Sequence, residues 1–417
     1  MTAIGSEIAD AQSALRRVAL GSLVSHVGAG ISRAFFDEPT GIPVLRSNNV
    51  KDGNVVLDGL KYWHRIDPTG ANLAKVKPHV GDLLINFVNG SQRELGKAAV
   101  FRGELPDCIV STNFFIVRVN VHEVLPDYLN YFLQSQEYRR WLFRTCGFSG
   151  QGSFNQEQLR SLTVPVSPIS HQKRVVTALG VLDAMRYSLK RLIDAKRILK
   201  RGLMQQLLTG QKRFCEFHNH PWHASRLGDH VTVVTRRNLN GQTLVLTASG
   251  QHGLVDQRRY FNRSVAGADL TKYHLLKKGE FAYNRSAMNG YPYGATKRLD
   301  EHEEGVLSTL YLCFEISDAR LDSDYLKHVL ESGVLNRQLR PIVRVGARAH
   351  GLLNISDDDF LSVSIPFPDL EEQRRIAGVL SLLDQEIELL TVQRAKTEDY
   401  KRGLLSKLLS GEIPVPA

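Results

Sequence analysis

Apolar residues recur at steps of three and four along two long stretches of the chain, and this spacing predicts amphipathic helices. The stretches cover roughly residues 172–210 and 373–411. The apolar stripe is narrow and keeps a heptad spacing, which is typical of a coiled-coil seam. A seam of about 36 residues would extend about 54 Å, longer than an ordinary surface helix needs, so we predict that the two helices pair with each other. The predicted seam residues are Val175, Leu179, Leu182, Leu189, Ile193, Leu199, Leu203, Leu207, Ile376, Leu380, Leu383, Ile387, Leu390, Tyr400, Leu404 and Leu408.

The two helical stretches are copies of one another. Residues 200–211 read KRGLMQQLLTGQ, and 201 residues later the chain reads KRGLLSKLLSGE. At the same offset QKRVVTALGVLD (172–183) lies on QRRIAGVLSLLD (373–384). Each copy ends at a glycine, Gly210 or Gly411, as expected of a helix C-terminus. The repeat indicates an internal duplication.

The segments that precede the helices correspond more faintly. Their short β-branched and aromatic runs, broken by Gly and Asn, predict strands. The matching pairs are GDLLIN (81–86) with GEFAYN (279–284), STNFFIVRVN (111–120) with STLYLCFEIS (308–317), DYLNYFLQS (127–135) with DYLKHVLES (324–332), FNQEQLRSLTVPV (154–166) with LNISDDDFLSVSIPF (353–367), and LGSLV (20–24) with LGDHV (227–231). Each helix therefore follows its own small globule.

The predicted fold is of the α+β class, with two small mixed α/β recognition domains, each followed by a long helix. We expect the helices to form an antiparallel coiled coil with internal pseudo-two-fold symmetry. The predicted regions are 14–168 (the first head), 169–213 (the first helical region), 222–367 (the second head) and 368–412 (the second helical region).

Charge and cysteine content narrow the classes of partner and compartment. Among 417 residues, Lys and Arg number 53 against 43 Asp and Glu, a net charge of +10 that favours a polyanionic partner such as nucleic acid. No apolar run reaches the roughly 18 residues of a membrane span, and the N-terminus lacks the pattern of a signal peptide. The four cysteines form no CxxC pair, which argues against a zinc site and predicts a cytoplasmic location.

A duplicated chain with two diverged heads suits a target with approximate two-fold symmetry and two copies of a partner subunit. Duplex DNA read at two half-sites is such a target, because half-sites lie about one helical turn, roughly 34 Å, apart. Heads that share a scaffold but differ in their loops would read different half-sites. The sequence therefore predicts a double-stranded DNA partner.

The chain resembles the DNA-specificity subunits of type I restriction–modification systems over nearly its whole length. The resemblance rests on the run GDLLIN…GS…GKAAV (81–100), the run from GSFN (152–155) into the first helix, and the KRGL phrase near each helix end, in an order that occurs twice. It implies a subunit without catalysis that binds a bipartite, asymmetric DNA sequence. The partners that it implies are two N6-adenine methyltransferase subunits and, for restriction, two motor-nuclease subunits. S-adenosylmethionine, ATP and Mg are then expected on those partners, and no cofactor is expected in this chain.

Motifs of an enzyme are weak or missing in the sequence. GSQRELGK (90–97) has five residues between its glycines instead of the four of a phosphate loop, and Ala98 stands where Ser or Thr would bind magnesium. GAG (28–30) is too short for a dinucleotide fingerprint. The Asn/Asp-Pro-Pro-aromatic tetrapeptide of an N6-adenine methyltransferase does not occur. We predict no catalytic or metal-binding residue in this chain.

The candidate DNA contacts are polar residues in loops that fall at equivalent places in the two heads, since bases are read by Arg, Lys, Asn, Gln, Ser and Thr side chains. In the first head they are Arg46, Asn48, Asn49, Asn89, Ser91, Gln92, Arg93 and Gln151. In the second head they are Gln251, Asn284, Arg285, Asn289, Tyr291, Tyr293, Arg344 and Arg348. The predicted phosphate contacts are Lys97, Arg236, Arg237 and Lys297.

Two other hypotheses remain open from the sequence. A stand-alone DNA-binding regulator would bind a palindromic operator as a homodimer, and the unequal heads argue against it. A coiled-coil scaffold without a nucleic-acid partner would not need the basic excess or the loops rich in Asn, Gln and Arg.

Overall fold

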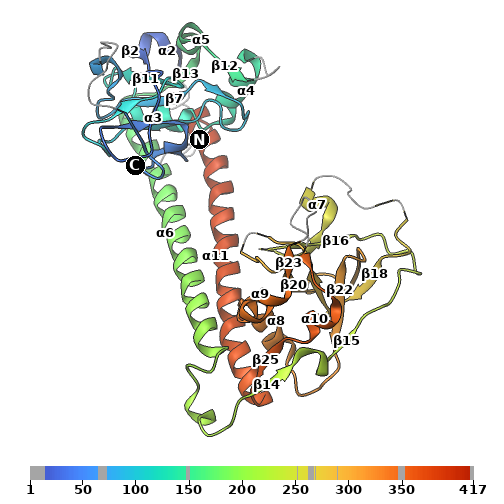
Figure 1. Cartoon of the computed structure of the whole chain (residues 1–417). Coiled ribbons are helices and arrows are strands. Elements are labelled where there is room, and N and C mark those ends of the chain that lie inside the picture. Colours follow the sequence, from blue (N-terminus) through green and yellow to red (C-terminus); the bar gives the residue numbers. More distant parts are fainter. Residues whose placement is uncertain are drawn as a thin grey trace, which may run out of the picture. The chain divides into compact units, whose positions relative to one another are not determined.

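The computed structural model (Figure 1) describes residues 15–63, 73–146, 151–250, 252–261, 267, 269–288, 290–345 and 353–413. The chain divides into two compact units. Unit 1 combines Met1–Leu189 with Gln393–Ala417, and unit 2 is Lys190–Val392. Each unit thus contains one head and a part of both long helices. The physical reason is that a long helix has no core of its own and joins the unit against which it packs.

Unit 1 is built on a mixed sheet whose two faces are both covered. Its described part has six strands in the order β2-β11-β7-β9-β5-β4. Their bounds are β2 Val24–Ala29, β11 Phe114–Val119, β7 Leu83–Asn86, β9 Ala98–Val100, β5 Asn54–Val55 and β4 Val50–Lys51. The other strands are β1 Arg16–Ala19, β3 Ile42–Leu45, β6 Lys61–Trp63, β8 Val88–Asn89, β10 Ile109–Val110, β12 Gly152–Ser153 and β13 Thr163–Val166. The helices are α2 Leu20–Leu23, α3 Pro126–Phe132, α4 Gln136–Thr145 and α5 Gln156–Ser161, with 3-10 turns at Ser47–Asn49 and Leu73–Val76.

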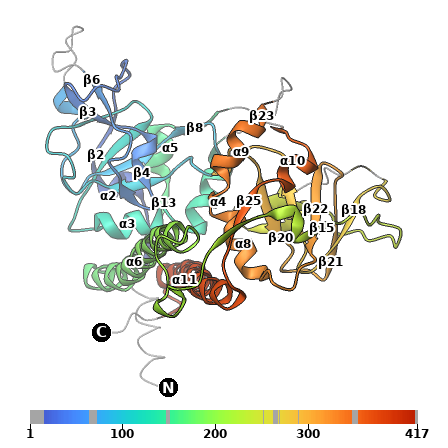
Figure 2. The same ribbon diagram turned by 60° about the horizontal axis from the view of Figure 1, so that its bottom comes forward.

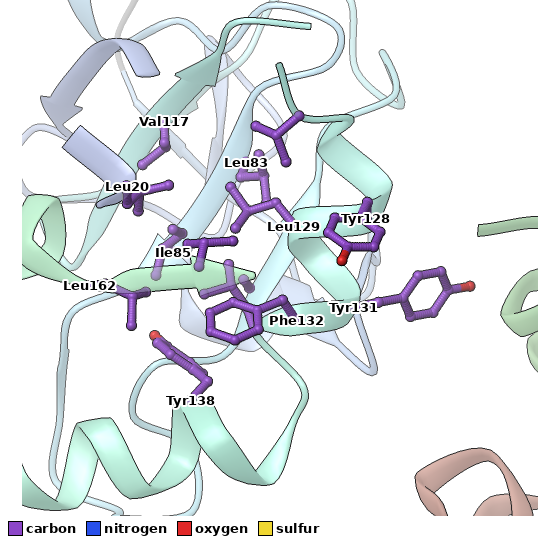
Figure 3. Close-up of a cluster of buried hydrophobic side chains, with 14 of the residues drawn as sticks. Leu20, Leu83, Ile85, Val117, Tyr128, Leu129, Tyr131, Phe132, Tyr138 and Leu162 are labelled. Atoms are coloured by element: carbon purple, nitrogen blue, oxygen red, sulfur yellow. The ribbon is translucent and has the colours of Figure 1, made fainter. Parts of the chain in front are cut away.

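The core of unit 1 follows from the alternation of side chains along its strands. Leu83 and Ile85 of β7 point into one cluster, which also holds Leu129 and Phe132 of α3 (Figure 3). Leu84, between them in the sequence, belongs to a second cluster on the other face of the sheet. The first cluster extends onto both long helices and includes Val175, Leu179, Leu405, Leu408 and Leu409. The head and the helix pair of unit 1 therefore share one core.

Unit 2 repeats this plan with a smaller sheet. Its described part has four strands in the order β15-β22-β19-β20, and α8 lies against β20 (Figure 2). The strand bounds are β14 His223–Arg226, β15 Val231–Val233, β16 Leu246–Ser249, β17 Gly253–Asp256, β18 His274–Lys277, β19 Phe281–Asn284, β20 Ala295–Arg298, β21 Glu304–Leu307, β22 Tyr311–Ile316, β23 Arg344–Val345, β24 Leu353–Asn354 and β25 Ser364–Phe367. The helices are α7 Gln257–Phe261, α8 Ser323–Glu331, α9 Asn336–Ile342 and α10 Asp357–Leu361, with 3-10 turns at Cys215–Phe217 and Leu227–Asp229.

Strand registers confirm that the two heads are equivalent. In unit 1, β11 pairs with β7 so that Phe114 lies opposite Asn86. In unit 2, β22 pairs with β19 so that Tyr311 lies opposite Asn284. The N-terminal strand of each head also pairs with the strand that leads into the long helix, β1 with β13 and β14 with β25. Apart from β1 and β14, these strands lie in the segments whose sequences match faintly.

A buried glutamine joins each head to the start of its long helix in the same way. The side chain of Gln172 accepts a hydrogen bond from the backbone of Leu125 at 2.8 Å and donates to the carbonyl of Glu123 at 2.9 Å. In unit 2, Gln373 accepts from the backbone of Asp322 at 2.8 Å and donates to the carbonyl of Arg320 at 3.0 Å. The repeated glutamine is therefore a structural residue in both copies.

The long helices, α6 (Ile169–Leu207) and α11 (Leu370–Ser410), lie side by side and antiparallel within each unit. In unit 2, Lys196 pairs with Glu386 and Lys200 pairs with Asp384, both at 2.6 Å. In unit 1, Asp183 pairs with Lys401 at 2.7 Å, and Arg186 pairs with Glu398. In both units the numbers rise along one helix as they fall along the other, which confirms the predicted antiparallel pairing.

One of these ion pairs occurs twice at equivalent positions. Asp183 and Asp384 are 201 residues apart, as are Lys200 and Lys401. The aspartate comes from α6 and the lysine from α11 in unit 1, and the roles of the helices are exchanged in unit 2. The duplication has thus kept one polar contact of the helix pair in each unit.

The seam prediction is wrong at one equivalent pair of positions. Leu199 is 49% exposed and Tyr400 is 64% exposed, because the following residue in each copy, Lys200 or Lys401, takes the inward position. Among the other predicted seam residues, the buried ones are Val175, Leu179, Leu189, Ile193, Leu207, Ile376, Leu380, Leu383 and Leu408, and the half-buried ones are Leu182, Leu203, Ile387, Leu390 and Leu404.

Both helices stop where the sequence predicts. Gly210 and Gly411 have positive φ angles of 71° and 70°, a conformation that residues with a Cβ rarely adopt. In the described part of the chain, no helix is both long enough and apolar enough to cross a membrane.

Candidate nucleic-acid interface

The loop between β7 and β9 carries most of the exposed candidate residues of the first head. Two backbone hydrogen bonds of 2.9 Å join the ends of this loop: Asn86 donates to the carbonyl of Lys97, and Gly96 donates to the carbonyl of Asn86. The side chain of Asn89 accepts a hydrogen bond from the backbone of Ser91 at 3.0 Å, which tightens the turn. The side chains of Ser91, Gln92 and Arg93 are exposed at this turn. The loop therefore presents three side chains that can donate hydrogen bonds to bases or phosphates.

A second predicted segment lies directly beside this loop. β12 pairs with β8, with Gly152 opposite Asn89 and Ser153 opposite Val88. The backbone of Phe154 also donates to the carbonyl of Phe87 at 3.1 Å. Gln151, at the start of this segment, is exposed. The structure thus brings two of the three predicted segments of the first head together.

Aromatic side chains of these two segments pack against other aromatic rings of the first head. Phe87 stacks on Phe115 with a centroid distance of 3.9 Å, and Phe154 contacts Trp141 edge to face at 5.5 Å. Asn155 then caps α5 by accepting from the backbone of Gln158 at 2.8 Å. The two segments are therefore held by packed aromatic side chains and by the capped helix α5.

The third predicted segment, 45–53, lies elsewhere in the first head. Its hairpin places Asn54 beside Val100, the last residue of β9, whereas the 87–97 loop leads into the first residue of that strand. The prediction that Asn49 contacts DNA is wrong. Asn49 is fully buried, and its side chain donates to the carbonyls of Val56 and Asp58 at 3.0 and 3.1 Å. Arg46 is half-buried and Asn48 is exposed, and for these two DNA contact stays a prediction.

Arginines of α4 adjoin the 87–97 loop and were missed in the sequence. Arg139 donates to the carbonyl of Leu95 at 2.6 Å and also to that of Arg93. Arg140 and Arg144 are exposed. The run YRRWLFR (138–144) could have revealed them, because it places several arginines on one short amphipathic helix. Lys97, a predicted phosphate contact, is paired with Glu94 at 2.7 Å.

The equivalent loop of the second head lies between β19 and β20. The backbone of Leu353 donates to the carbonyl of Arg285 at 2.8 Å, the counterpart of the bond from Phe154 to Phe87. Asn284 is half-buried and donates to the sulfur of Met288 at 3.6 Å, and Arg285 forms an ion pair with Asp357. The second head thus assembles its loop as the first does, although its candidate side chains make more internal contacts.

The prediction that Lys297 contacts phosphate is wrong. Its side chain is 4% exposed, and its Nζ lies 2.7 Å from Glu331 and 3.0 Å from the hydroxyl of Tyr291. Burial alone would lower the pKa of Lys297, but Glu331 and Tyr291 outweigh it, and the pKa stands above its usual value. A lysine engaged in this way is not available to DNA.

The other predicted DNA contacts of the second head are either engaged in contacts within the protein or lie outside the described residues. Arg236 is ion-paired with Glu280, and the exposed Arg237 donates to the carbonyl of Lys272 at 2.5 Å. Tyr293 is half-buried, and its carbonyl accepts from the hydroxyl of Tyr283 at 2.7 Å. Gln251, Asn289 and Arg348 lie outside the described residues, as does the side chain of Arg344.

Helix α7 adds exposed residues that were not singled out in the sequence. Arg258 and Arg259 are exposed on it, followed by Tyr260 and Phe261, which are 48% and 45% exposed. The two aromatic rings contact each other edge to face at 4.9 Å. Arginines next to exposed aromatic rings favour contact with a nucleic acid, since they combine charge with stacking surfaces.

No group of three or more His, Cys, Asp or Glu side chains that could hold a metal ion occurs among the residues that the structure describes. His218, His220 and His223 are all exposed in the segment after α6. The arrangement described so far offers hydrogen-bond donors and cations on loops.

Comparisons with known proteins agree with the fold. A family model of the type I restriction modification DNA specificity domain matches residues 274–398. A protein of Methanocaldococcus jannaschii, described as the putative specificity subunit of the MjaX type I restriction enzyme, is 23% identical over 394 residues, which is 90% of this chain and 88% of the relative.

Two solved structures share the fold over almost their full length. The S subunit of a type I restriction–modification system from M. genitalium covers 97% of both chains with 13% identity and a TM-score of 0.56. A chain from a structure of complex assembly and conformational transition in a type I system covers 96% of this chain and 98% of its own, with 17% identity and a TM-score of 0.55.

The two heads, the paired helices and these matches point to one class of protein. The chain resembles the specificity subunits of type I restriction–modification systems over nearly its whole length. The resemblance seen in the sequence is therefore confirmed.

Proposed function

We propose that this chain reads an asymmetric, two-part DNA sequence, with one half-site bound by each head. It docks two N6-adenine methyltransferase subunits and, with motor-nuclease subunits, directs restriction. S-adenosylmethionine, ATP and Mg then belong to those partners, and none of them to this chain. The complex acts on DNA in the cytoplasm, a location that the free thiols of Cys108, Cys146, Cys215 and Cys313 support.

One observation carries this proposal: the two units have equivalent scaffolds but different recognition loops. The turn after β7 presents Ser91, Gln92 and Arg93, whereas in the loop after β19 Arg285 is ion-paired. Loops of different chemistry on equivalent supports would read different base sequences. An asymmetric target follows, because two different half-sites do not form a palindrome.

Exposed apolar side chains on the long helices support docking of two copies of one partner. In unit 1 these include Val181 of α6 and Tyr400 of α11, which are 62% and 64% exposed. In unit 2 the residues at the equivalent positions, Leu382 of α11 and Leu199 of α6, are 59% and 49% exposed. Apolar residues exposed at the same places in both units are typical of a surface that a partner covers.

The decisive experiment is to express this chain together with a methyltransferase encoded beside its gene and to map N6-methyladenine in the host DNA. We expect methylation confined to one asymmetric motif, made of two parts separated by a fixed gap. The control is the methyltransferase expressed alone, which should methylate no such motif.

Other outcomes would contradict the proposal. Methylation at a continuous palindrome would mean that the heads do not read separate half-sites. A complex that assembles without new methylation would favour a regulator or a scaffold, and binding to a palindromic operator by the chain alone would favour the regulator.

A further inference from the structure

Lys297 and Tyr291 were predicted to contact DNA. In the structure they belong to a polar cluster that joins β20, α8 and the loop before β20 in the second head. Lys297 lies on β20, Tyr291 in the loop before that strand, and Glu331 at the end of α8. The question is what a buried lysine does at this place.

The cluster ties three elements of the second head together. Lys297 donates to Glu331 at 2.7 Å and to the hydroxyl of Tyr291 at 3.0 Å. The same ammonium group lies 4.8 Å from the centroid of the Tyr291 ring. The Tyr291 hydroxyl lies within 3.4 Å of the carbonyl of Gly250, in the turn between β16 and β17. The lysine therefore fixes the loop to α8, and the tyrosine fixes it to a neighbouring hairpin.

Burial makes this cluster sensitive to the loss of any one member. Lys297 is 4% exposed, and the Glu331 side chain is 18% exposed. Burial would raise the pKa of Glu331, but the charge of Lys297, aided by Lys200 and Lys327, holds it below its usual value. Both groups are therefore charged, and each needs its partner, since an unpaired charge in such a site is strongly unfavourable.

The first head holds its loop with a different cation. The strand registers place Lys297 opposite Ala282 and Ala99 opposite Leu84, which makes Ala99 the counterpart of Lys297. Ala99 is fully buried and has no polar side chain. Instead, Arg139 of α4 donates to the carbonyls of Arg93 and Leu95 in the loop. In each head a buried or half-buried cation thus contacts the loop, and a different element supplies it.

We propose that Lys297 and Arg139 are positioning residues for target recognition, each fixing the loop of its own head and thereby the base discrimination at one half-site. The proposal rests on the proposed function and deepens it, because it assigns to each half-site a residue that does not contact DNA. A rigid loop discriminates bases better than a mobile one, since its donors are already aligned with the edges that they read.

The test uses the whole methyltransferase complex and a library in which both half-sites are varied. Lys297→Met should lower discrimination against single mismatches about tenfold at one half-site and leave the other unchanged. Arg139→Met should do the same at the opposite half-site. Lys278→Met and Arg174→Met are matched controls, because both side chains are exposed, and neither control should change discrimination.

A milder variant keeps the test valid if Lys297→Met does not fold. Tyr291→Phe removes the hydroxyl that Lys297 and Gly250 contact but leaves the ion pair with Glu331 intact. It should relax the same half-site to a smaller extent, with thermal stability close to that of the unchanged chain. A purely structural role would instead lower methylation at all sites in parallel with stability.

The outcomes separate the two proposals. If the unchanged complex methylates no bipartite motif, the proposed function fails and this inference fails with it. If the motif is found but the folded variants relax neither half-site, or both equally, only the positioning role is overturned. Relaxation of opposite half-sites by Lys297→Met and Arg139→Met would establish it.

Discussion

Buried lysines in the helix pair do more than contribute charge to a basic protein. Lys401 is 4% exposed and contacts Asp183 at 2.7 Å, Gln134 at 3.3 Å and the ring of Tyr131. Tyr131 is a member of the core cluster of unit 1 whose ring extends from α3 (Figure 3), and its hydroxyl donates to Asp183 at 2.9 Å. The lysine thus lies where α3 of the head meets both long helices.

Substitution of Asp183 should leave the buried Lys401 without its carboxylate partner and lower the stability of the fold. We expect Asp183→Ala to lower the free energy of unfolding by about 2 kcal/mol, less than for a fully buried pair because Asp183 is partly exposed. Urea unfolding measures the loss. The control Arg402→Ala, at an exposed position of α11, should change stability by less than about 0.5 kcal/mol. An equal effect of both substitutions would show that the pair contributes nothing specific.

His328, the counterpart of Tyr131 in unit 2, should make stability depend on pH. It is 1% exposed and lies 3.0 Å from the hydroxyl of Ser381. Burial, with help from Lys200 and Lys327, lowers its pKa from 6.5 to about 4, against the opposing effect of Asp384 and Glu331. The unfolded chain therefore binds a proton at a pH where the folded chain does not.

The sign follows from this lowered pKa. Above pH 6.5 the histidine is neutral in both the folded and the unfolded chain, so it does not change the free energy of unfolding. As the pH falls from 6.5 toward 4, protonation stabilises the unfolded chain, so stability should fall by about 2 kcal/mol at pH 5. Urea unfolding at pH 7 and pH 5 measures the change, and His328→Asn should remove this part of it. An unchanged pH dependence in that variant would contradict the lowered pKa.

At the scale of elements, each recognition loop depends on neighbours that are distant in the sequence. The 87–97 loop is held by β12, by the aromatic base of Phe87 and Phe154, and by α4. The loop after β19 is held by the first residue of β24 and by α8. Loop sequence alone therefore does not define what each head presents.

The exposed arginines of α4 should act on DNA phosphates without reading bases. We expect Arg140→Ala/Arg144→Ala to weaken binding about equally for all sequences and to reduce the slope of log K against log salt by roughly 1 for each arginine that neutralises a phosphate. Lys173→Ala/Arg174→Ala, exposed on α6, removes the same charge and serves as the control. A change in sequence preference would instead assign α4 to base reading.

At the scale of the whole molecule, each unit has a core of its own and a part of both long helices. Phe314 illustrates the core of unit 2, since it is fully buried and stacks on Phe281 with a centroid distance of 5.4 Å. The sharing of helices means that each half of α6 is stabilised by a different core.

A cavity in one core should therefore affect only a part of each helix. We expect Phe314→Ala to destabilise unit 2 by about 3–5 kcal/mol. Amide hydrogen exchange should accelerate in residues 190–207 of α6 much more than in residues 169–189, which belong to unit 1. Equal acceleration along the whole helix would mean that the units unfold as one.

The sequence by itself determined the repeat, the two long helices with their glycine ends, and the matching strands of the two heads. These features depend on local spacing and turn chemistry, so a periodic pattern is enough to predict them. The pattern also distinguished recognition loops from the scaffold that carries them. It predicted the wrong inward residue at Leu199 and Tyr400, because the next residue in each copy turns inward to form an ion pair.

Only the tertiary structure decided which polar residues are free to bind. Asn49 and Lys297 look like DNA contacts in the sequence, but distant backbone and carboxylate groups already satisfy them. Burial and hydrogen-bond partners are set by elements far away along the chain, and no local pattern records them. For the same reason, the assignment of each half of a long helix to a different core could not be predicted from its heptads.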